Sequence, residues 1–201
     1  MNKEKELIDK LIDLAFAEDI GDGDHTTLSC IPATAMGKSK LLIKEAGVLA
    51  GIEVAKEIFN RFDPSMKVEV FINDGTEVKP GDVAMIVEGK VQSLLQTERL
   101  MLNVMQRMSG IATMTRKYAK VLEGTHTRVL DTRKTTPGMR ILEKMAVKIG
   151  GGVNHRIGLF DMILLKDNHV DFAGGIDKAI NRAKDYCKDC LLYTSPSPRD
   201  P

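Results

Sequence analysis

The second half of the chain alternates between strand-like and helix-like apolar patterns, and this alternation limits the possible folds more than any other feature. Residues 127–131 favour a strand, and the continuous apolar run 162–165 is typical of a strand buried on both faces. Residues 137–149 and 176–186 carry apolar side chains at helical spacing. A β–α–β–α order predicts an α/β fold with a parallel sheet, in which the carboxyl ends of the strands meet at one rim.

Cationic residues follow the first predicted strand. Residues 131–140 hold three cations in ten positions, where a strand should end and a helix begin. An Arg guanidinium offers a fork that matches a carboxylate, and a Lys ammonium offers a point charge for a phosphate. Of the adjacent residues Arg133 and Lys134, one can therefore bind a carboxylate and the other a phosphate. We expect Thr136 to cap the next helix with Pro137 at its first position, which would bring free N–H groups to the same place.

Positive charge is concentrated in this part of the chain. Residues 131–170 hold seven Lys or Arg against four Asp or Glu, a local charge of +3 in a chain whose net charge is +1. Lys166 follows the second predicted strand and would join the same rim. His155 and Arg156 come after three glycines, which would allow the backbone to approach a ligand closely. The sequence therefore predicts a site for an anionic substrate.

Composition argues against several other classes of function. The near-neutral charge disfavours bulk binding to nucleic acid or to an anionic membrane, and the absence of Trp with only 4% aromatic residues removes most stacking platforms for single strands. No apolar run approaches the roughly 20 residues that span a bilayer. Three cysteines are too few for a disulfide framework, and the first residues carry charges of both signs without a signal-type apolar block. We expect a cytoplasmic protein.

The first half of the chain predicts a smaller α/β unit. Apolar residues at helical spacing predict two helices, over 3–17 and 52–62. Short β-favouring runs predict four strands, over 36–46, 48–50, 68–72 and 83–91. A long helix should follow from Ser93, with Gln96 completing a capping box and Ser109-Gly110 interrupting the helix.

One turn in this unit leaves a different class of protein open. The segment Lys79-Pro80-Gly81 is similar to the turn of a biotinyl- or lipoyl-type carrier module. Such a module needs an exposed, covalently modified Lys at the tip of a hairpin. An ordinary structural β-turn is the simpler interpretation of these residues.

Three motifs in this order and spacing resemble quinolinate phosphoribosyltransferases. The motifs are Asp-Thr-Arg-Lys-Thr-Thr-Pro-Gly-Met-Arg at 131–140, Gly-Gly-Gly-Val-Asn-His-Arg at 150–156 and Leu-Lys-Asp-Asn-His at 165–169. The resemblance extends from about residue 5 to residue 189. It implies an amino-terminal α/β sandwich over 1–108, followed by an open α/β barrel of which 109–189 would be the first part.

The resemblance also implies a reaction. Members of the family join quinolinate to phosphoribosyl pyrophosphate with Mg²⁺, and the products are nicotinate mononucleotide, pyrophosphate and CO₂. By resemblance the protein would be a homodimer or a multiple of one. The substrate-binding residues would be Arg99, Thr132, Arg133, Lys134, His155, Arg156 and Lys166.

The resemblance gives these residues different roles. Arg133, His155 and Arg156 would surround the quinolinate carboxylates. Lys134 and Lys166 would be catalytic and would serve the phosphoribosyl and carboxylate charges. Arg99 would reach the partner subunit's site, which would explain a cation on so apolar a helix.

The chain departs from the family's pattern at its carboxyl end. The family continues with further barrel strands that supply acidic residues for Mg²⁺, so we expect no metal ligand in this chain. Residues 190–201 change to a Ser/Pro-rich string that we interpret as a non-native tail, and the chain as an inactive fragment. A phosphoribosyltransferase for another aromatic acid, such as nicotinate or the substrate of the molybdenum-transport-associated type, is the alternative.

Overall fold

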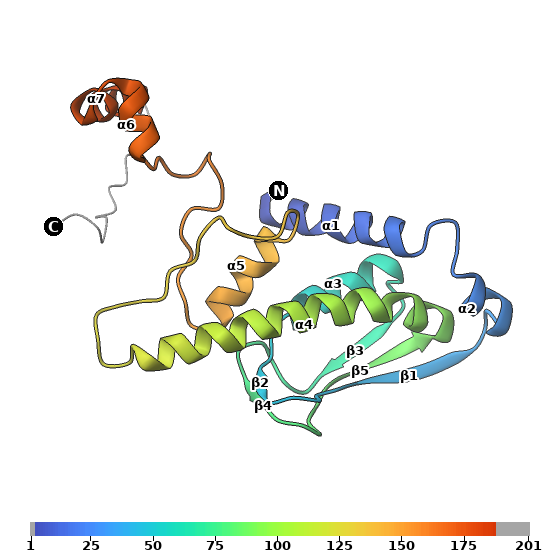
Figure 1. Cartoon of the computed structure of the whole chain (residues 1–201). Helices are drawn as coiled ribbons and strands as arrows, with labels where there is room; N and C mark the ends of the chain where they lie inside the picture. Colours follow the sequence, from blue (N-terminus) through green and yellow to red (C-terminus); the bar gives the residue numbers. More distant parts are fainter. Residues whose placement is uncertain (1–2, 188–201) are drawn as a thin grey trace. The chain divides into compact units, whose positions relative to one another are not determined.

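The computed structural model describes residues 3–187, which belong to two compact units that meet in sequence between His155 and Arg156 (Figure 1). The first unit contains α1 (Lys3–Asp19), α2 (His25–Cys30), β1 (Met36–Leu42), β2 (Gly47–Val48), α3 (Ile52–Phe62), β3 (Lys67–Val70), β4 (Glu77–Val78), β5 (Val83–Lys90), α4 (Val91–Val121) and α5 (Arg140–Ile149). The second unit contains α6 (Asp167–Ala173) and α7 (Ile176–Tyr186). The predicted tail, 190–201, lies outside the described residues.

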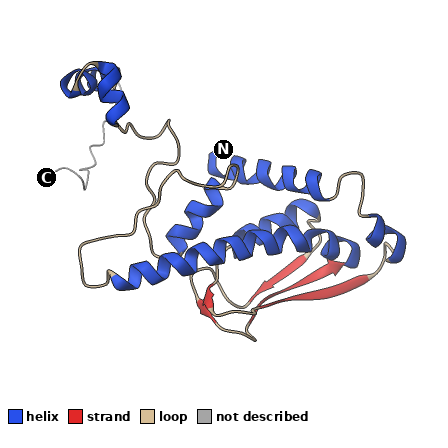
Figure 2. Ribbon diagram, viewed as in Figure 1, coloured by secondary structure: helices blue, strands red, loops and turns tan. Residues whose placement is uncertain are grey.

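The first unit is built on a small antiparallel sheet. Its strand order is β1-β5-β3, and β2 pairs with β4 in a separate two-stranded sheet. Helices α3 and α4 cover one face of the larger sheet (Figure 2). All four strands predicted in this region are confirmed, with ends that differ by a few residues. The segment 79–82 forms a tight turn, in which the Asp82 carboxylate accepts a hydrogen bond of 2.9 Å from the Lys79 N–H.

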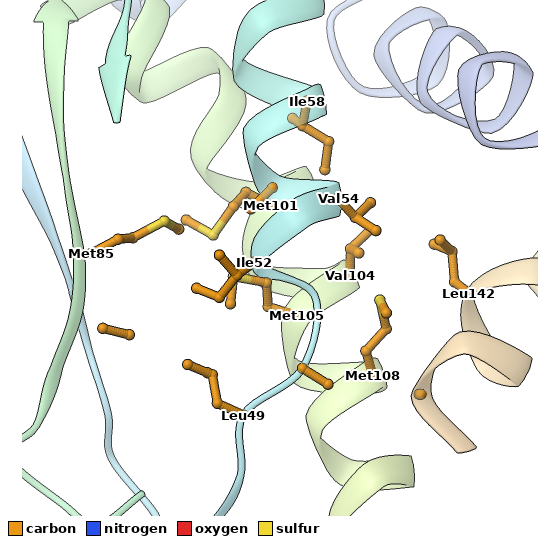
Figure 3. Close-up of a cluster of buried hydrophobic side chains, with 14 of the residues drawn as sticks. Leu49, Ile52, Val54, Ile58, Met85, Met101, Val104, Met105, Met108 and Leu142 are labelled. Atoms are coloured by element: carbon orange, nitrogen blue, oxygen red, sulfur yellow. The ribbon is translucent and has the colours of Figure 1, made fainter. Parts of the chain in front are cut away.

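The core of this unit lies between the sheet and its helices. Met85 of β5 points toward Met101 of α4, and Leu142 of α5 approaches the same core from the other side (Figure 3). Burial of each such side chain contributes about 1.5–3 kcal/mol to folding. The other buried core residues drawn and labelled in Figure 3 are Leu49, Ile52, Val54, Ile58, Val104, Met105 and Met108.

Helix α4 is continuous where an interruption was predicted. It runs from Val91 to Val121 through Ser109 and Gly110, and the predicted division at residues 108 and 109 therefore falls inside one helix. The Ser109 hydroxyl contacts the backbone of Ala50 in the neighbouring loop, so it does not compete with the hydrogen bonds of its own helix. One Gly costs a helix about 1 kcal/mol, and the buried face of α4 outweighs that cost.

The predicted capping box at the start of α4 is wrong, because the helix begins two residues before Ser93. Instead, the Ser93 hydroxyl donates a hydrogen bond of 2.7 Å to the carboxylate of Asp63, the residue that follows α3. Ser65 donates to the other oxygen of the same carboxylate. Both hydrogen bonds favour the charged carboxylate, with Ser65 the larger influence, and they lower the pKa of Asp63 below its usual value.

A lowered carboxyl pKa stabilises the folded chain above the pKa of the unfolded state, and the contribution disappears as the pH falls through the folded pKa. We therefore expect Ser93→Ala to lower the free energy of unfolding by about 1 kcal/mol at pH 7. The difference from wild type should shrink below roughly pH 4. Urea unfolding at pH 7 and pH 3 measures this difference in the free energy of unfolding. Ser39→Ala, at an exposed position of β1, is the control. An equal difference at both pH values would contradict this account.

The two strands predicted for the barrel are absent from the described residues. Leu130 forms only one parallel bridge, to Val153, and residues 162–165 form no strand. A strand exists only where a neighbour accepts and donates its backbone hydrogen bonds, and no described segment pairs with 162–165. Accordingly, Leu164 and Leu165 are 38% and 37% exposed, rather than buried on both faces as predicted.

Candidate functional site

The cationic segment forms a turn before α5 rather than the first turn of a helix. Gly138 has a φ of +81°, a left-handed conformation that an α-helix excludes, so α5 begins at Arg140 and not at Pro137. Thr136 does not cap the helix through its side chain; its hydroxyl accepts a hydrogen bond of 2.7 Å from Arg107. The segment 132–139 therefore extends as a loop that side chains from α4 and α5 hold in place.

Two cations outside the predicted site fix the path of this loop. Arg107 of α4 is paired with the carboxylate of Glu143 on α5, in addition to its contact with Thr136. Arg140 donates from Nε to the Thr135 hydroxyl at 3.0 Å and from a terminal nitrogen to the Arg133 carbonyl at 3.5 Å. Both guanidinium groups are thus used to position the backbone of the loop.

Arg133 differs from these two cations. Its Nε is buried and has no hydrogen-bond partner among the described residues. A buried N–H without an acceptor costs about 1–3 kcal/mol, so the group is suited to a ligand that brings an acceptor. Its neighbours Thr132 and Lys134 are exposed, and the Thr132 hydroxyl accepts a hydrogen bond of 3.1 Å from the Lys134 N–H. The turn therefore offers a guanidinium and an ammonium to an anion.

His155 is joined to the same turn through Asp131. The His155 N–H donates to Asp131 Oδ1 at 2.8 Å, and the His155 carbonyl accepts from Lys144 Nζ at 3.0 Å. Lys144 and Asp131 are themselves paired at 2.6 Å. The structure thus brings together the backbone segments that carry two of the predicted site residues, Arg133 and His155.

The remaining predicted residues of the barrel lie in the second unit. Arg156 donates a hydrogen bond of 3.0 Å to the Met162 carbonyl, so part of its guanidinium holds the loop that follows it. Lys166 is exposed and immediately precedes α6, and its backbone N–H donates to His169 Nδ1 at 3.0 Å. The ammonium group of Lys166 makes no hydrogen bond or ion pair within residues 3–187.

Arg99 lies on the exposed side of α4 and has no hydrogen bond or ion pair in the part of the chain that the structure describes. It is eight residues before Arg107, which corresponds to about 12 Å along the helix axis. Arg107 contacts the turn, and Arg99 does not contact it. The structure therefore leaves the Arg99 guanidinium available to another molecule.

Two of the glycines before His155 have a role in packing that the sequence did not predict. A Cβ on Gly150 would lie 2.5 Å from the Ala112 carbonyl oxygen, and a Cβ on Gly152 would lie 2.9 Å from the Thr115 side chain. These two glycines are needed because the end of α5 packs closely against α4. Whether they also allow a ligand to approach the backbone stays a prediction.

Sequence reasoning did not find Lys144 as a member of the site. It is 1% exposed and lies on the buried side of α5, one turn after Ile141. A signal was present, because the apolar pattern of this helix places position 144 on its packed face, where an unpaired Lys is rare. A buried Lys predicts a buried carboxylate nearby, and Asp131 is that partner.

A separate cavity of about 550 Å³ lies beside α4 in the first unit, and none of the seven predicted site residues lines it. Residues 41–49, from the end of β1 through β2, form one wall, and Leu102, Met105 and Met114 contribute to the other. Within residues 3–187 there is no group of three or more His, Cys, Asp or Glu side chains that could hold a metal ion. We derive no step through Mg²⁺.

Solved structures define the class of fold. NadC from Streptococcus pyogenes aligns with a TM-score of 0.84 and 42% sequence identity, over 90% of this chain and 64% of that chain. The nicotinate-nucleotide pyrophosphorylase from Ehrlichia chaffeensis aligns with a TM-score of 0.84 and 36% identity, over 92% of this chain and 67% of that chain. The chain therefore has the α/β fold of these enzymes, in incomplete form.

Comparisons of sequence then define the family. The family model "Quinolinate phosphoribosyl transferase, N-terminal domain" matches residues 24–109, and the corresponding C-terminal domain model matches residues 111–192. The chain belongs to the quinolinate phosphoribosyltransferase family. It is 49% identical over 183 residues to quinolinate phosphoribosyltransferase [decarboxylating] 1b of Nicotiana tabacum, an alignment that covers 90% of this chain. The chain spans about half the length of the curated relatives it matches, 52% in that case.

Proposed function

We propose that this chain carries the quinolinate-binding part of a quinolinate phosphoribosyltransferase. The observation that carries the proposal is the buried, unpartnered Nε of Arg133. The neighbouring cations Arg107 and Lys144 are already paired with carboxylates, whereas Arg133 has no carboxylate partner among residues 3–187. An incoming carboxylate would supply the missing acceptor and would compensate the charge. His155, joined to the same turn through Asp131, would stand beside it as a second group for a diacid.

The reaction that we propose needs positioning more than a protein nucleophile. The pyridine nitrogen attacks the anomeric carbon of phosphoribosyl pyrophosphate, the new C–N bond forms, and the bond to pyrophosphate breaks. CO₂ then leaves its bonding electron pair on the ring carbon, where the adjacent positive nitrogen stabilises it, and that carbon uses the pair to take up a proton. Lys134 and Lys166 would stabilise the negative charge of the phosphoribosyl and carboxylate groups, and Thr132 would line the turn. Mg²⁺ stays a prediction for the whole enzyme.

We also propose that two copies of the protein associate through the exposed side of α4. Leu95, Met114 and Tyr118 are between 44% and 60% exposed on this helix, which is more apolar surface than a solvated helix usually presents. Arg99 lies on the same helix and has no partner in the described part of its own chain. An Arg in that position would supply a cation to the site of the partner subunit.

The location of the protein in the cell is a further proposal. Within the described part of the chain, none of the helices combines the length and the apolar character that a bilayer crossing demands. Some relatives are named as chloroplastic or mitochondrial proteins. We propose the cytoplasm, on the basis of the low cysteine content.

A calorimetric titration of the chain with quinolinate, and then with nicotinate, tests the proposed substrate. Quinolinate has a second carboxylate, and a hydrogen bond to a charged group contributes about 1.5–3 kcal/mol. We therefore expect quinolinate to bind at least about tenfold more tightly than nicotinate. Equal affinities would contradict the choice of a diacid and would favour a phosphoribosyltransferase for a monoacid.

A further inference from the structure

A buried ion pair lies directly beneath the proposed binding turn. The side chains of Lys144 and Asp131 are 2% and 7% exposed, and Lys144 Nζ lies 2.6 Å from Asp131 Oδ1. The same carboxylate oxygen accepts from the His155 N–H at 2.8 Å, and the same ammonium donates to the His155 carbonyl at 3.0 Å. The pair therefore contacts both backbone polar groups of His155.

A role in stability alone does not explain this pair. Removing two charges from water costs several kcal/mol per ion, and well-packed apolar residues often stabilise a protein as well as a buried ion pair does. Three of the other buried residues of α5, Ile141, Leu142 and Ala146, are apolar, and the fourth, Glu143, is paired with Arg107. A buried pair does provide a fixed geometry, because each charge must meet its partner and the nearby backbone groups in one arrangement.

The ion pair of Asp131 and Lys144 lies next to the point where regular backbone hydrogen bonding ends. Leu130 and Val153 form a single parallel bridge, flanked by hydrogen bonds from Val153 N to Val129 O at 2.8 Å and from Asp131 N to Val153 O at 3.1 Å. Beyond this bridge, the side chains of Asp131 and Lys144 connect the two backbone segments. The Asn154 amide, in the orientation that satisfies both its oxygen and its nitrogen, donates to Asp131 Oδ2 and to the Lys144 carbonyl at 2.9 Å each.

We propose that Asp131 and Lys144 are a positioning pair, which fixes the segment carrying Arg133 against the segment carrying His155 so that both side chains can meet one substrate. This inference rests on the proposed function, and it concerns residues that touch each other rather than the substrate. Arg133 follows Asp131 by two residues, so a displacement of the Asp131 carboxylate changes the position of the guanidinium and of His155 together.

The test compares stability with affinity in three variants: Asp131→Leu, Lys144→Met and the double variant. Each single variant leaves one charge buried and unpaired, so both should melt well below wild type. The double variant removes both charges, so it should be at least as stable as either single variant. Its affinity for quinolinate should nevertheless stay at least about tenfold below wild type, because His155 is no longer fixed. Lys148→Met, an exposed change on the same helix, is the matched control.

Two further readouts separate the possible outcomes. If the double variant regains stability and also binds quinolinate like wild type, the pair is structural only and the proposal is overturned. Amide hydrogen exchange of His155 measures the connection without any ligand, and it should accelerate at least about tenfold in the double variant while the amide of Ala146 changes little. A wild-type chain that does not bind quinolinate would overturn the proposed function.

In that case, the exchange of the His155 amide still tests the pair. Unchanged exchange in the double variant would overturn the positioning pair as well, and accelerated exchange would support its role in connecting the two segments. If the double variant does not fold, Asp131→Asn replaces it, with the same exchange criterion.

Discussion

Arg133→Ala should abolish measurable quinolinate binding while the chain stays folded. The buried Nε of Arg133 has no hydrogen-bond partner among the described residues, so the substitution breaks no side-chain hydrogen bond of that nitrogen. We expect a change in melting temperature of no more than about 2 °C, as for other substitutions that break no contact. Loss of a charge-assisted fork to a carboxylate should lower the affinity at least about a hundredfold. Calorimetric titration and a thermal melt of the same sample measure both effects.

Two variants control this experiment. Arg133→Lys keeps the charge and removes the planar fork, so its affinity should lie between those of wild type and the alanine variant. Arg128→Ala removes an exposed cation five residues earlier and should leave both affinity and melting temperature unchanged. If Arg133→Ala binds quinolinate as tightly as wild type, Arg133 does not belong to the site.

Gly150→Ala should produce a large loss of stability. A Cβ at this position would lie 2.5 Å from the Ala112 carbonyl oxygen and 2.7 Å from the Thr115 Cβ, distances that require α4 and α5 to separate. Gly150 has a φ of −71°, so the cost comes from the close contact and not from the backbone conformation. We expect the free energy of unfolding to fall by about 3 kcal/mol, or about 10 °C in melting temperature.

Gly110→Ala is the matched control on the neighbouring helix. Gly110 lies inside α4, and a Cβ there would meet no atom within 4 Å. Alanine is preferred over glycine in a helix interior by about 1 kcal/mol, so this variant should melt above wild type. If Gly150→Ala were as stable as Gly110→Ala, the result would contradict the close packing of α5 on α4 at Gly150.

Much of the first unit could be predicted because its local patterns agree with its packing. The helix predicted over 52–62 matches α3 at both ends, with Asp63 as the residue that follows it. The barrel strands could not be predicted in the same way. The apolar run 162–165 has the composition of a buried strand, but a strand also needs a paired neighbour, and sequence pattern alone does not supply one.

The site could be predicted only in part, because some of its residues depend on contacts that are distant in the sequence. Arg133 and His155 stand in short motifs with an evident chemical use, and the structure joins the segments that carry them. Lys144 lies in an ordinary helical pattern. Its role is evident only from its contact with Asp131, which is thirteen residues earlier in the sequence. The role of Gly150 also depends on a distant element, because its nearest neighbours belong to α4.

The most direct measurement is a titration of the ¹⁵N-labelled chain with quinolinate, followed by NMR of the backbone amides. A diacid fixed by the turn and by the neighbouring loop should shift the amides of Arg133, Lys134 and His155 together, and the shifts should saturate with one affinity. The amides of Thr113 and Lys117, beside the separate cavity along α4, should not move. Shifts confined to that cavity, or no shifts at all, would contradict the assignment of this turn as the quinolinate site.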